Sequence, residues 1–167
     1  KGIQTAEDAR LCAENGVEGL VVSNHGGHAL DGTEGTIDML PEVVDAVGNS
    51  LEVYVDGGIR HGSDVLKCLA LGAKAAFIGR PIFWGLSVDG QDGLSHILEI
   101  LRDELDVAMG LCGLSDIKNA NPSLVSYPGS RNHRGGLIAS LDRLVELLEQ
   151  GYIERNEFDS LKAKLLN

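Results

Sequence analysis

Short apolar runs alternate with amphipathic stretches along the first two thirds of the chain. The apolar runs are rich in β-branched residues, which is typical of strands buried on both faces. We expect three such strands, at residues 17–23, 51–55 and 75–78. Apolar residues recur at helical spacing between and around them. This pattern predicts four helices, at residues 5–15, 37–47, 63–71 and 93–109.

Strand, loop and helix follow one another repeatedly, as in parallel strands joined by right-handed crossovers. The unusual residues gather where each strand ends, at 23–27, 56–60 and 79–80. Function at the carboxyl ends of parallel strands is typical of barrels and doubly wound sheets. A complete (β/α)8 barrel takes about 250 residues. We therefore expect an α/β fold that is the C-terminal portion of a TIM (β/α)8 barrel, with about three parallel strands and four helices.

The periodicity is interrupted after residue 115 by asparagine, proline and glycine, which favour loops. Two leucine-rich amphipathic segments follow, at residues 137–150 and from about Asn156 onward, with Gly151 between them. The expected organisation is a partial barrel at 1–125, a linker at 126–136 and a small helical hairpin at 137–167. A hairpin of about 30 residues buries little by itself, so we expect it to dock or to self-associate.

Charge and composition exclude several classes of function. The chain has 14 basic and 25 acidic residues, a formal net charge of −11, which argues against a general nucleic-acid binder. Any bound phosphate must therefore sit in a local cradle. Three widely spaced cysteines fit a reducing, cytoplasmic location. We find no signal peptide and no apolar run near the roughly 20 residues that span a bilayer. Because the chain opens with Lys1 in the middle of a motif, we expect a piece of something longer.

Two glycine-rich strand ends have the chemistry of a phosphate site. They are Asp56-Gly57-Gly58-Ile59-Arg60 and Gly79-Arg80. Glycines let backbone N–H groups approach an anion, and arginine adds charge and forked donors. In a TIM barrel the loops after the last two strands are the usual phosphate site. The alternative is a pair of tight turns with arginines in solvent.

The first strand end, Ser23-Asn24-His25-Gly26-Gly27-His28, carries a candidate base. A histidine among glycines is open to a ligand, and its ordinary pKa suits proton transfer near neutral pH. His25 could instead only cap a turn. A metal site on His25, His28 and Asp31 is disfavoured, because a glycine loop fixes ligand geometry poorly, so we expect no metal. Lys1-Gly2-Ile3 has the pattern of a preceding strand's end, which would aim Lys1 at the same mouth.

Several of these motifs, in this order and spacing, resemble those of the FMN-dependent α-hydroxy-acid dehydrogenases, the family of glycolate oxidase and the flavin lactate dehydrogenases. The resemblance covers roughly residues 1–125 and includes Leu71-Gly72-Ala73 and Ile78-Gly79-Arg80-Pro81. It implies FMN as cofactor and an oxidoreductase acting on a 2-hydroxy acid or a related C–H substrate.

The resemblance also implies residue roles. His25 would take the proton from the substrate's α-hydroxyl as hydride passes to flavin N5, or would take the α-proton in a carbanion mechanism. Lys1 would lie beside flavin N1 and O2, and Ser23 would contact the flavin. Asp56 would hold the ribityl hydroxyls. The phosphate ligands would be Gly58, Arg60, Gly79 and Arg80.

One position departs from the family pattern. The family has an arginine for the substrate carboxylate where this chain has His28, and an imidazole lacks the guanidinium fork. His25 and His28 are therefore the candidate substrate contacts. With Trp84-Gly85-Leu86 and Asp89-Gly90-Gln91, this departure resembles the mycofactocin-associated subgroup, whose substrate is an amine-bearing ring. The tail resembles the SHOCT module, a short unit thought to aid oligomerisation or docking.

The first half of the family's barrel, with its further flavin contacts and the aspartate that orients the histidine, has no counterpart here. We therefore expect this chain alone to bind flavin weakly at best. The expected partners are a small-molecule substrate and either further copies of the chain or the first half-barrel. The alternatives are another FMN- or phosphate-binding barrel, and a non-catalytic remnant that acts through its helical tail.

Overall fold

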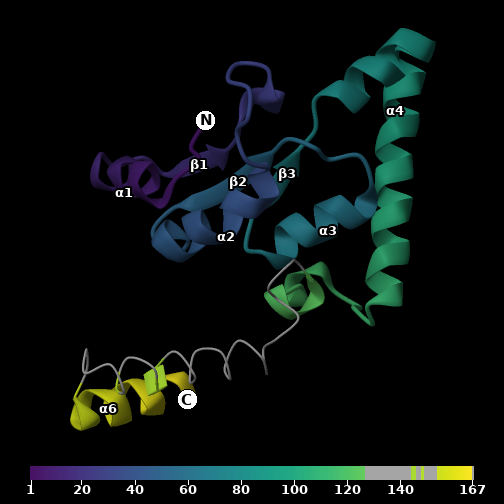
Figure 1. Cartoon of the computed structure of the whole chain (residues 1–167). Coiled ribbons are helices and arrows are strands. Elements are labelled where there is room, and N and C mark those ends of the chain that lie inside the picture. Colours follow the sequence, from purple (N-terminus) through teal and green to yellow (C-terminus); the bar gives the residue numbers. More distant parts are fainter. Residues whose placement is uncertain (127–143, 146–147, 149–153, 167) are drawn as a thin grey trace. The chain divides into compact units, whose positions relative to one another are not determined.

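The computed structural model describes residues 1–126, 144–145, 148 and 154–166, and the chain divides into two compact units, Lys1–Val125 and Ser126–Asn167. The helices and strands of the first unit follow one another in alternation (Figure 1). They are α1 (Ala6–Glu14), β1 (Gly19–Val22), η1 (His25–Gly27), α2 (Thr36–Val47), β2 (Glu52–Asp56), α3 (Gly62–Ala70), β3 (Ala75–Phe77), α4 (Arg80–Leu111), η2 (Ile117–Asn119) and η3 (Pro122–Leu124).

The three expected strands form one parallel sheet in the order β1-β2-β3. Leu20 pairs with Val53, and Val55 pairs with Ala76. Ile3 adds an isolated parallel bridge to Val22, so the first residues of the chain run alongside β1. Because the three strands run in one direction, the loops after β1, β2 and β3 meet at one edge of the sheet. The Lys1 side chain reaches the same edge, where it contacts Ser23 and Asp56.

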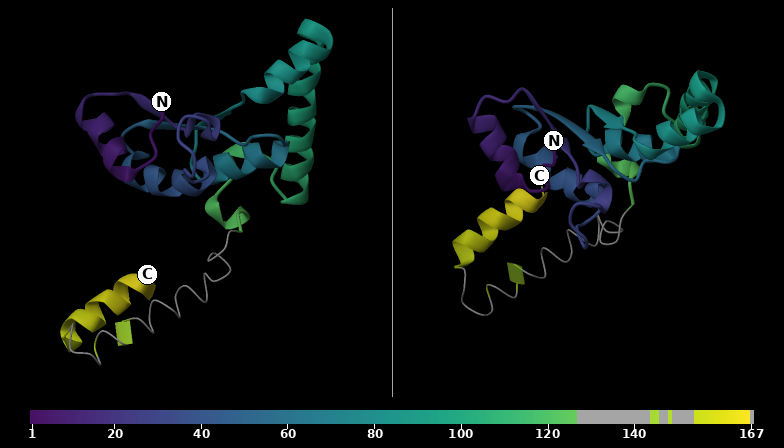
Figure 2. Two further views of the ribbon diagram at one scale, coloured as in Figure 1. Left: turned by 45° about the horizontal axis from the view of Figure 1, so that its top comes forward. Right: turned by 90° about the horizontal axis from the view of Figure 1, so that it is seen from above.

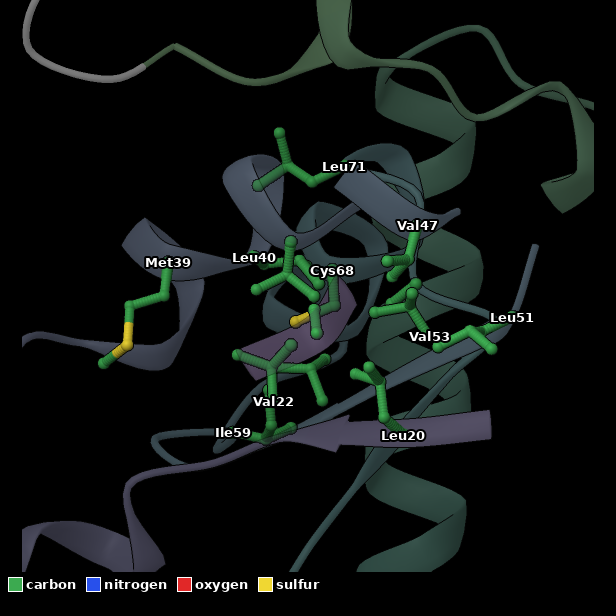
Figure 3. Packing of buried hydrophobic residues seen from close by; sticks show 14 residues of the cluster. Leu20, Val22, Met39, Leu40, Val47, Leu51, Val53, Ile59, Cys68 and Leu71 are labelled. Carbon is green, nitrogen blue, oxygen red and sulfur yellow. The ribbon is translucent and has the colours of Figure 1, made fainter. Parts of the chain in front are cut away.

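The core lies on the face of the sheet that packs against the helices. Leu20, Val22 and Val53 point toward α2 and α3, where they meet Leu40 and Cys68 (Figure 3). Side chains alternate between the two faces of a strand, and the pairing places Tyr54 and Phe77 on the opposite face. Phe77 is 48% exposed there, although it stacks on Tyr54 with ring centroids 5.7 Å apart. The first unit thus has one packed face and one open face.

Helices α2 and α3 each begin one residue before the expected start. α2 begins at Thr36, and Pro41 lies inside it, although proline usually occupies a first turn. α3 begins at Gly62, capped by His61, one residue before the expected start at Ser63. These shifts are small and leave both helices on the expected strand-to-strand crossovers.

The last helix of the first unit is longer than its pattern indicates. α4 begins at Arg80 rather than near Gly93, and its helical geometry is broken at Asp89 and Gly90. Figure 2 shows the two segments folding back on each other at this break. They touch at glycines, because a Cβ on Gly93 would lie only 2.1 Å from the Gly85 carbonyl oxygen. The periodicity of apolar residues could not indicate this contact, because it depends on two glycines, which have no side chain.

A second glycine sets the crossing of α3 and α4. A Cβ on Gly62 would lie 2.1 Å from the backbone nitrogen of Leu105, so the two helix backbones touch. The Gly62 N–H donates to Glu104 Oε2 at 2.8 Å, and that carboxylate also pairs with His61 at 3.2 Å. The Gly62 N–H and the His61 ring favour the charged carboxylate, and the pKa of Glu104 is lowered. The start of α3 is therefore fastened to α4.

In the second unit, α6 spans Arg155–Leu166. Phe158 is buried, with Arg155 5.5 Å and Lys162 6.0 Å from its ring centroid. The expected linker at 126–136 and most of the expected helix at 137–150 lie outside the described residues. Among the described helices, none is both long and apolar enough to cross a bilayer.

Candidate functional site

A cavity of about 430 Å³ opens at the carboxyl edge of the sheet. Its lining comes from all four chain segments that end there: the first residues of the chain and the loops after β1, β2 and β3. The lining residues singled out from the sequence are Lys1, His25, His28, Asp56, Gly58, Arg60, Gly79 and Arg80. Of the expected site residues, Ser23 alone is absent from this lining.

Lys1 connects two of the strand ends. Its ammonium group lies 2.9 Å from Asp56 Oδ2 and donates to Ser23 Oγ at 2.8 Å. The lysine side chain is 46% exposed, whereas that of Asp56 is 19% exposed. The other carboxylate oxygen, Oδ1 of Asp56, is buried and has no hydrogen-bond partner within the described part of the chain. Buried polar atoms are usually satisfied, so the unpartnered oxygen makes Asp56, which lines the cavity, a candidate ligand contact.

Ser23 lies behind the cavity rather than in its wall. It is fully buried, and its Oγ also accepts from the His25 backbone N–H at 3.1 Å. The serine hydroxyl thus joins the lysine ammonium group to the backbone that carries the histidine. Gln4 supports the same residue by donating to the Ser23 carbonyl oxygen at 3.4 Å.

His25 is held in an uncommon conformation. Its φ of +54° lies in the left-handed region, where residues other than glycine are rare. The imidazole lies against the backbone of Gly2, where an added Cβ would come within 2.8 Å of the His25 Cε1 atom. Gly2 itself has a φ of +97° and donates to the Val21 carbonyl oxygen at 3.2 Å. Strained residues cluster at functional sites, and this one faces the cavity of Arg60 and Arg80.

Two arginines approach the cavity from neighbouring strand ends. Arg60 donates from Nη1 to the Ile59 carbonyl oxygen at 2.8 Å, and its guanidinium carbon lies 5.0 Å from the Trp84 ring centroid. Arg80 is the first residue of α4, and within residues 1–126 its side chain has no polar partner. Gly58 has a φ of +76°, which exposes backbone N–H groups. Two cations, a glycine turn and a helix N-terminus favour an anion.

The turn that presents Arg60 is fixed by one carboxylate. Asp64 Oδ2 accepts from the backbone N–H groups of Arg60 and His61, both at 3.1 Å, and Oδ1 pairs with Lys67 at 3.3 Å. Burial raises the pKa of Asp64, but the two backbone donors and Lys67 outweigh it, and the net pKa is lowered. The carboxylate therefore remains charged and holds the turn at neutral pH.

The loop after β1 is closed at its base by Asn24. Its side chain accepts from the Gly26 N–H at 3.0 Å and donates to the Glu34 carbonyl oxygen at 3.1 Å. His28 reaches the cavity from this loop, whereas Asp31 is not among the lining residues. The described residues contain no group of three or more side chains placed to hold a metal ion.

Sequence reasoning missed the supporting residues. Gly2, Thr36, Asp64 and Trp84 each touch a residue of a predicted site loop, but all four lie outside the loop that they support. For Asp64 a signal existed, since an acid at the third helical position completes a capping box. The other contacts join segments between 21 and 24 residues apart, which local patterns do not reveal.

Comparison with known proteins gives a consistent result. The profile of the FMN-dependent dehydrogenase family matches residues 1–127. The chain is 52% identical over 125 residues to 2-hydroxyacid oxidase 1 of Mus musculus, covering 75% of this chain and 34% of that protein. It is 50% identical over 125 residues to L-lactate oxidase of Nostoc sp., with the same coverage of both chains.

A solved structure of mandelate oxidase with (S)-2-phenylpropionate shares 51% identity at a TM-score of 0.69. That match covers 72% of this chain and 36% of the other. The chain thus spans about a third of the length of the curated relatives that it matches. Because the family profile covers most of the chain and the fold agrees with that of the oxidase, the chain belongs to the FMN-dependent dehydrogenase family.

Proposed function

We propose that residues 1–125 are the C-terminal portion of a TIM barrel that binds FMN and oxidises a 2-hydroxy acid or a related C–H substrate. The observation that carries this proposal is the single cavity in which a histidine, a lysine–aspartate pair and two arginines meet. A base, a charged pair and an anion cradle are the parts that such an oxidation needs. The match to 2-hydroxyacid oxidase 1 and L-lactate oxidase supports the substrate class.

The cavity residues fit FMN chemically. The unpartnered Asp56 Oδ1 is an acceptor of the kind that a ribityl hydroxyl requires. Arg60, Arg80 and the turns at Gly58 and Gly79 would hold the phosphate. Lys1 would supply a positive charge to the ring. When bound, FMN takes up the hydrogen and the two electrons that leave the substrate's α-carbon.

The chain's own contribution to the oxidation is proton transfer. His25 lines the cavity, and its backbone N–H is already bound to Ser23. Within residues 1–126 its ring makes no hydrogen bond or ion pair, so the imidazole could accept the proton of the substrate's α-hydroxyl. Loss of that proton raises the electron density on the α-carbon as its hydrogen departs. General base catalysis of this kind contributes about 10²- to 10⁴-fold in rate.

His28 affects which substrate the cavity can bind. It lines the same cavity, and an imidazole offers at most two donors where a guanidinium offers five. This difference motivates a second candidate substrate, an amine-bearing ring of the kind that the mycofactocin-associated subgroup takes. We further propose that the tail is a SHOCT-like docking or oligomerisation hairpin.

The decisive experiment replaces His25 by alanine in the complete protein and follows flavin reduction by stopped flow without oxygen. Lactate, glycolate, mandelate and a set of cyclic amines are the substrates to compare. We expect reduction by the best substrate to slow by about 10²- to 10⁴-fold. His96→Ala, an exposed histidine of α4 outside the cavity, is the matched control and should reduce normally. An undiminished rate in His25→Ala would remove the base assignment.

A further inference from the structure

Arg60 is held by two different contacts that leave most of its donors unused. One Nη1–H bonds to the Ile59 carbonyl oxygen at 2.8 Å. The guanidinium carbon lies 5.0 Å from the Trp84 ring centroid, within the roughly 6 Å over which a cation and a ring attract each other. A guanidinium has five N–H donors. Within residues 1–126 no other acceptor takes one from the Arg60 side chain.

Trp84 occupies a particular place on α4. It lies four residues after Arg80, and residues four apart share one side of a helix. The ring that contacts Arg60 is therefore on the same side of α4 as the second arginine of the cavity. Through Trp84, the loop after β2 is joined to the N-terminal turns of α4.

The chemistry of the contact suits an anion site. Two guanidinium groups that face one cavity repel each other until an anion binds. A carboxylate could hold Arg60 in place, but it would occupy the donors and cancel the charge that phosphate needs. An aromatic face attracts the cation and leaves the donors free.

We propose that Trp84 is a positioning residue for Arg60, which it holds beside Arg80 so that the donors of both arginines converge on a phosphate monoester. The inference rests on the proposed phosphate site. Trp84 is 52% exposed, so burial alone does not account for an aromatic side chain there. Trp84 is also the only tryptophan of the chain, and its emission can therefore be assigned.

The test titrates inorganic phosphate into the full chain and follows the Arg60 Nε–H signal by NMR, with Trp84 emission as a second signal. In the unaltered chain we expect the ring current of Trp84 to shift the Arg60 signal, and phosphate should move the Arg60 signal and the Trp84 emission together. Trp84→Leu should abolish the ring-current shift of the Arg60 signal. It should also lower the affinity for phosphate about two- to five-fold, as expected from an exposed cation–ring contact. Trp84→Phe keeps an aromatic ring, so it should retain most of the ring-current shift and most of the phosphate affinity.

A double-mutant cycle with Arg60→Lys isolates the pair. Because lysine lacks the planar guanidinium, Trp84→Leu should lower the affinity for phosphate by much less when Arg60 is already lysine. Leu86→Ala, an exposed apolar residue of the same helical segment outside the cavity, is the control. It should leave the Arg60 signal and the phosphate affinity unchanged.

Two results would overturn the proposal, and they are distinguishable. Equal phosphate affinity in Trp84→Leu and the unaltered chain, with weaker binding in Arg60→Lys, would remove the role of Trp84 and leave the phosphate site intact. Phosphate that perturbs neither Arg60 nor Arg80 in the unaltered chain would overturn the phosphate site, and the role of Trp84 with it.

Discussion

At His25, different neighbours control the backbone and the side chain. Ser23 Oγ accepts the backbone N–H of His25, a residue in the left-handed conformation. Gly2 provides the surface on which the imidazole rests. Both neighbours flank Lys1 or bind it, so the base and the cation of the cavity share one support.

Gly2→Ala should therefore disturb the base more than the fold. The new Cβ would lie 2.8 Å from the imidazole, and a displacement of about 1 Å at a reacting group can cost about 100-fold in rate. We expect the His25 ring signals to shift in NMR spectra, and flavin reduction in the complete protein to slow by at least about ten-fold.

Gly16→Ala is the matched control for that variant. Gly16 has a φ of +72°, so an alanine there would carry similar backbone strain, but its Cβ would meet nothing within 4 Å. Each variant should lose about 1–2 kcal/mol of unfolding free energy from the left-handed conformation. Unchanged His25 signals in Gly2→Ala would contradict the packing argument.

At the scale of elements, the start of α3 decides where Arg60 lies. Asp64 holds the turn from within the helix, while Gly62 and Glu104 fasten the same turn to α4. The two arms of the anion cradle, the loop after β2 and the N-terminal turn of α4, are thereby parts of one packed unit. A substitution that shifts either helix should therefore also shift the residues that line the cavity.

Asp64→Ala should lower the free energy of unfolding by about 1 kcal/mol at pH 7, the usual effect of losing a helix cap. The pKa of Asp64 is lower in the folded chain. Its contribution is therefore present above the unfolded pKa and is lost as the pH falls through the folded pKa. Urea denaturation at pH 7 and pH 3 should show the deficit at pH 7 shrinking at pH 3. Asp45→Asn, an exposed carboxylate of α2, is the control. A deficit that does not change with pH would refute the electrostatic argument.

At the scale of the molecule, one face of the sheet is open to solvent, and so is one side of the cavity. Lys1 and Phe77 are each about half exposed, and His25 is exposed as well. A flavin ring held here by the 167 residues alone would be in contact with solvent over much of its surface.

We expect the isolated 167-residue chain to bind FMN weakly, because the phosphate contacts are present and the cavity leaves much of the ring exposed. Purified chain mixed with FMN should emerge from gel filtration without the yellow absorbance. Inorganic phosphate should still perturb Arg60 and Arg80 in the NMR titration. Stoichiometric flavin that remained with the chain through the column would show that this expectation is wrong.

Local sequence patterns were sufficient for the order of the elements. The three apolar runs predicted the parallel strands, and the glycines after them marked the edge where the cavity lies. Lys1, His25, Asp56, Arg60 and Arg80 could be selected because each sits at a strand end, and parallel strands bring their carboxyl ends together. Periodicity and turn residues report burial and backbone direction, which are local properties.

The pairing of particular side chains depended on the tertiary structure. Lys1 with Asp56, Gly2 with His25 and Arg60 with Trp84 are all more than 20 residues apart, and each meeting depends on how a crossover helix is packed. The break in α4 likewise depends on two glycines that let backbones touch. The sequence by itself therefore determined most of the polar residues that face the cavity, although it also placed Ser23 there. Only the packing of the tertiary structure decided what holds each of them in place.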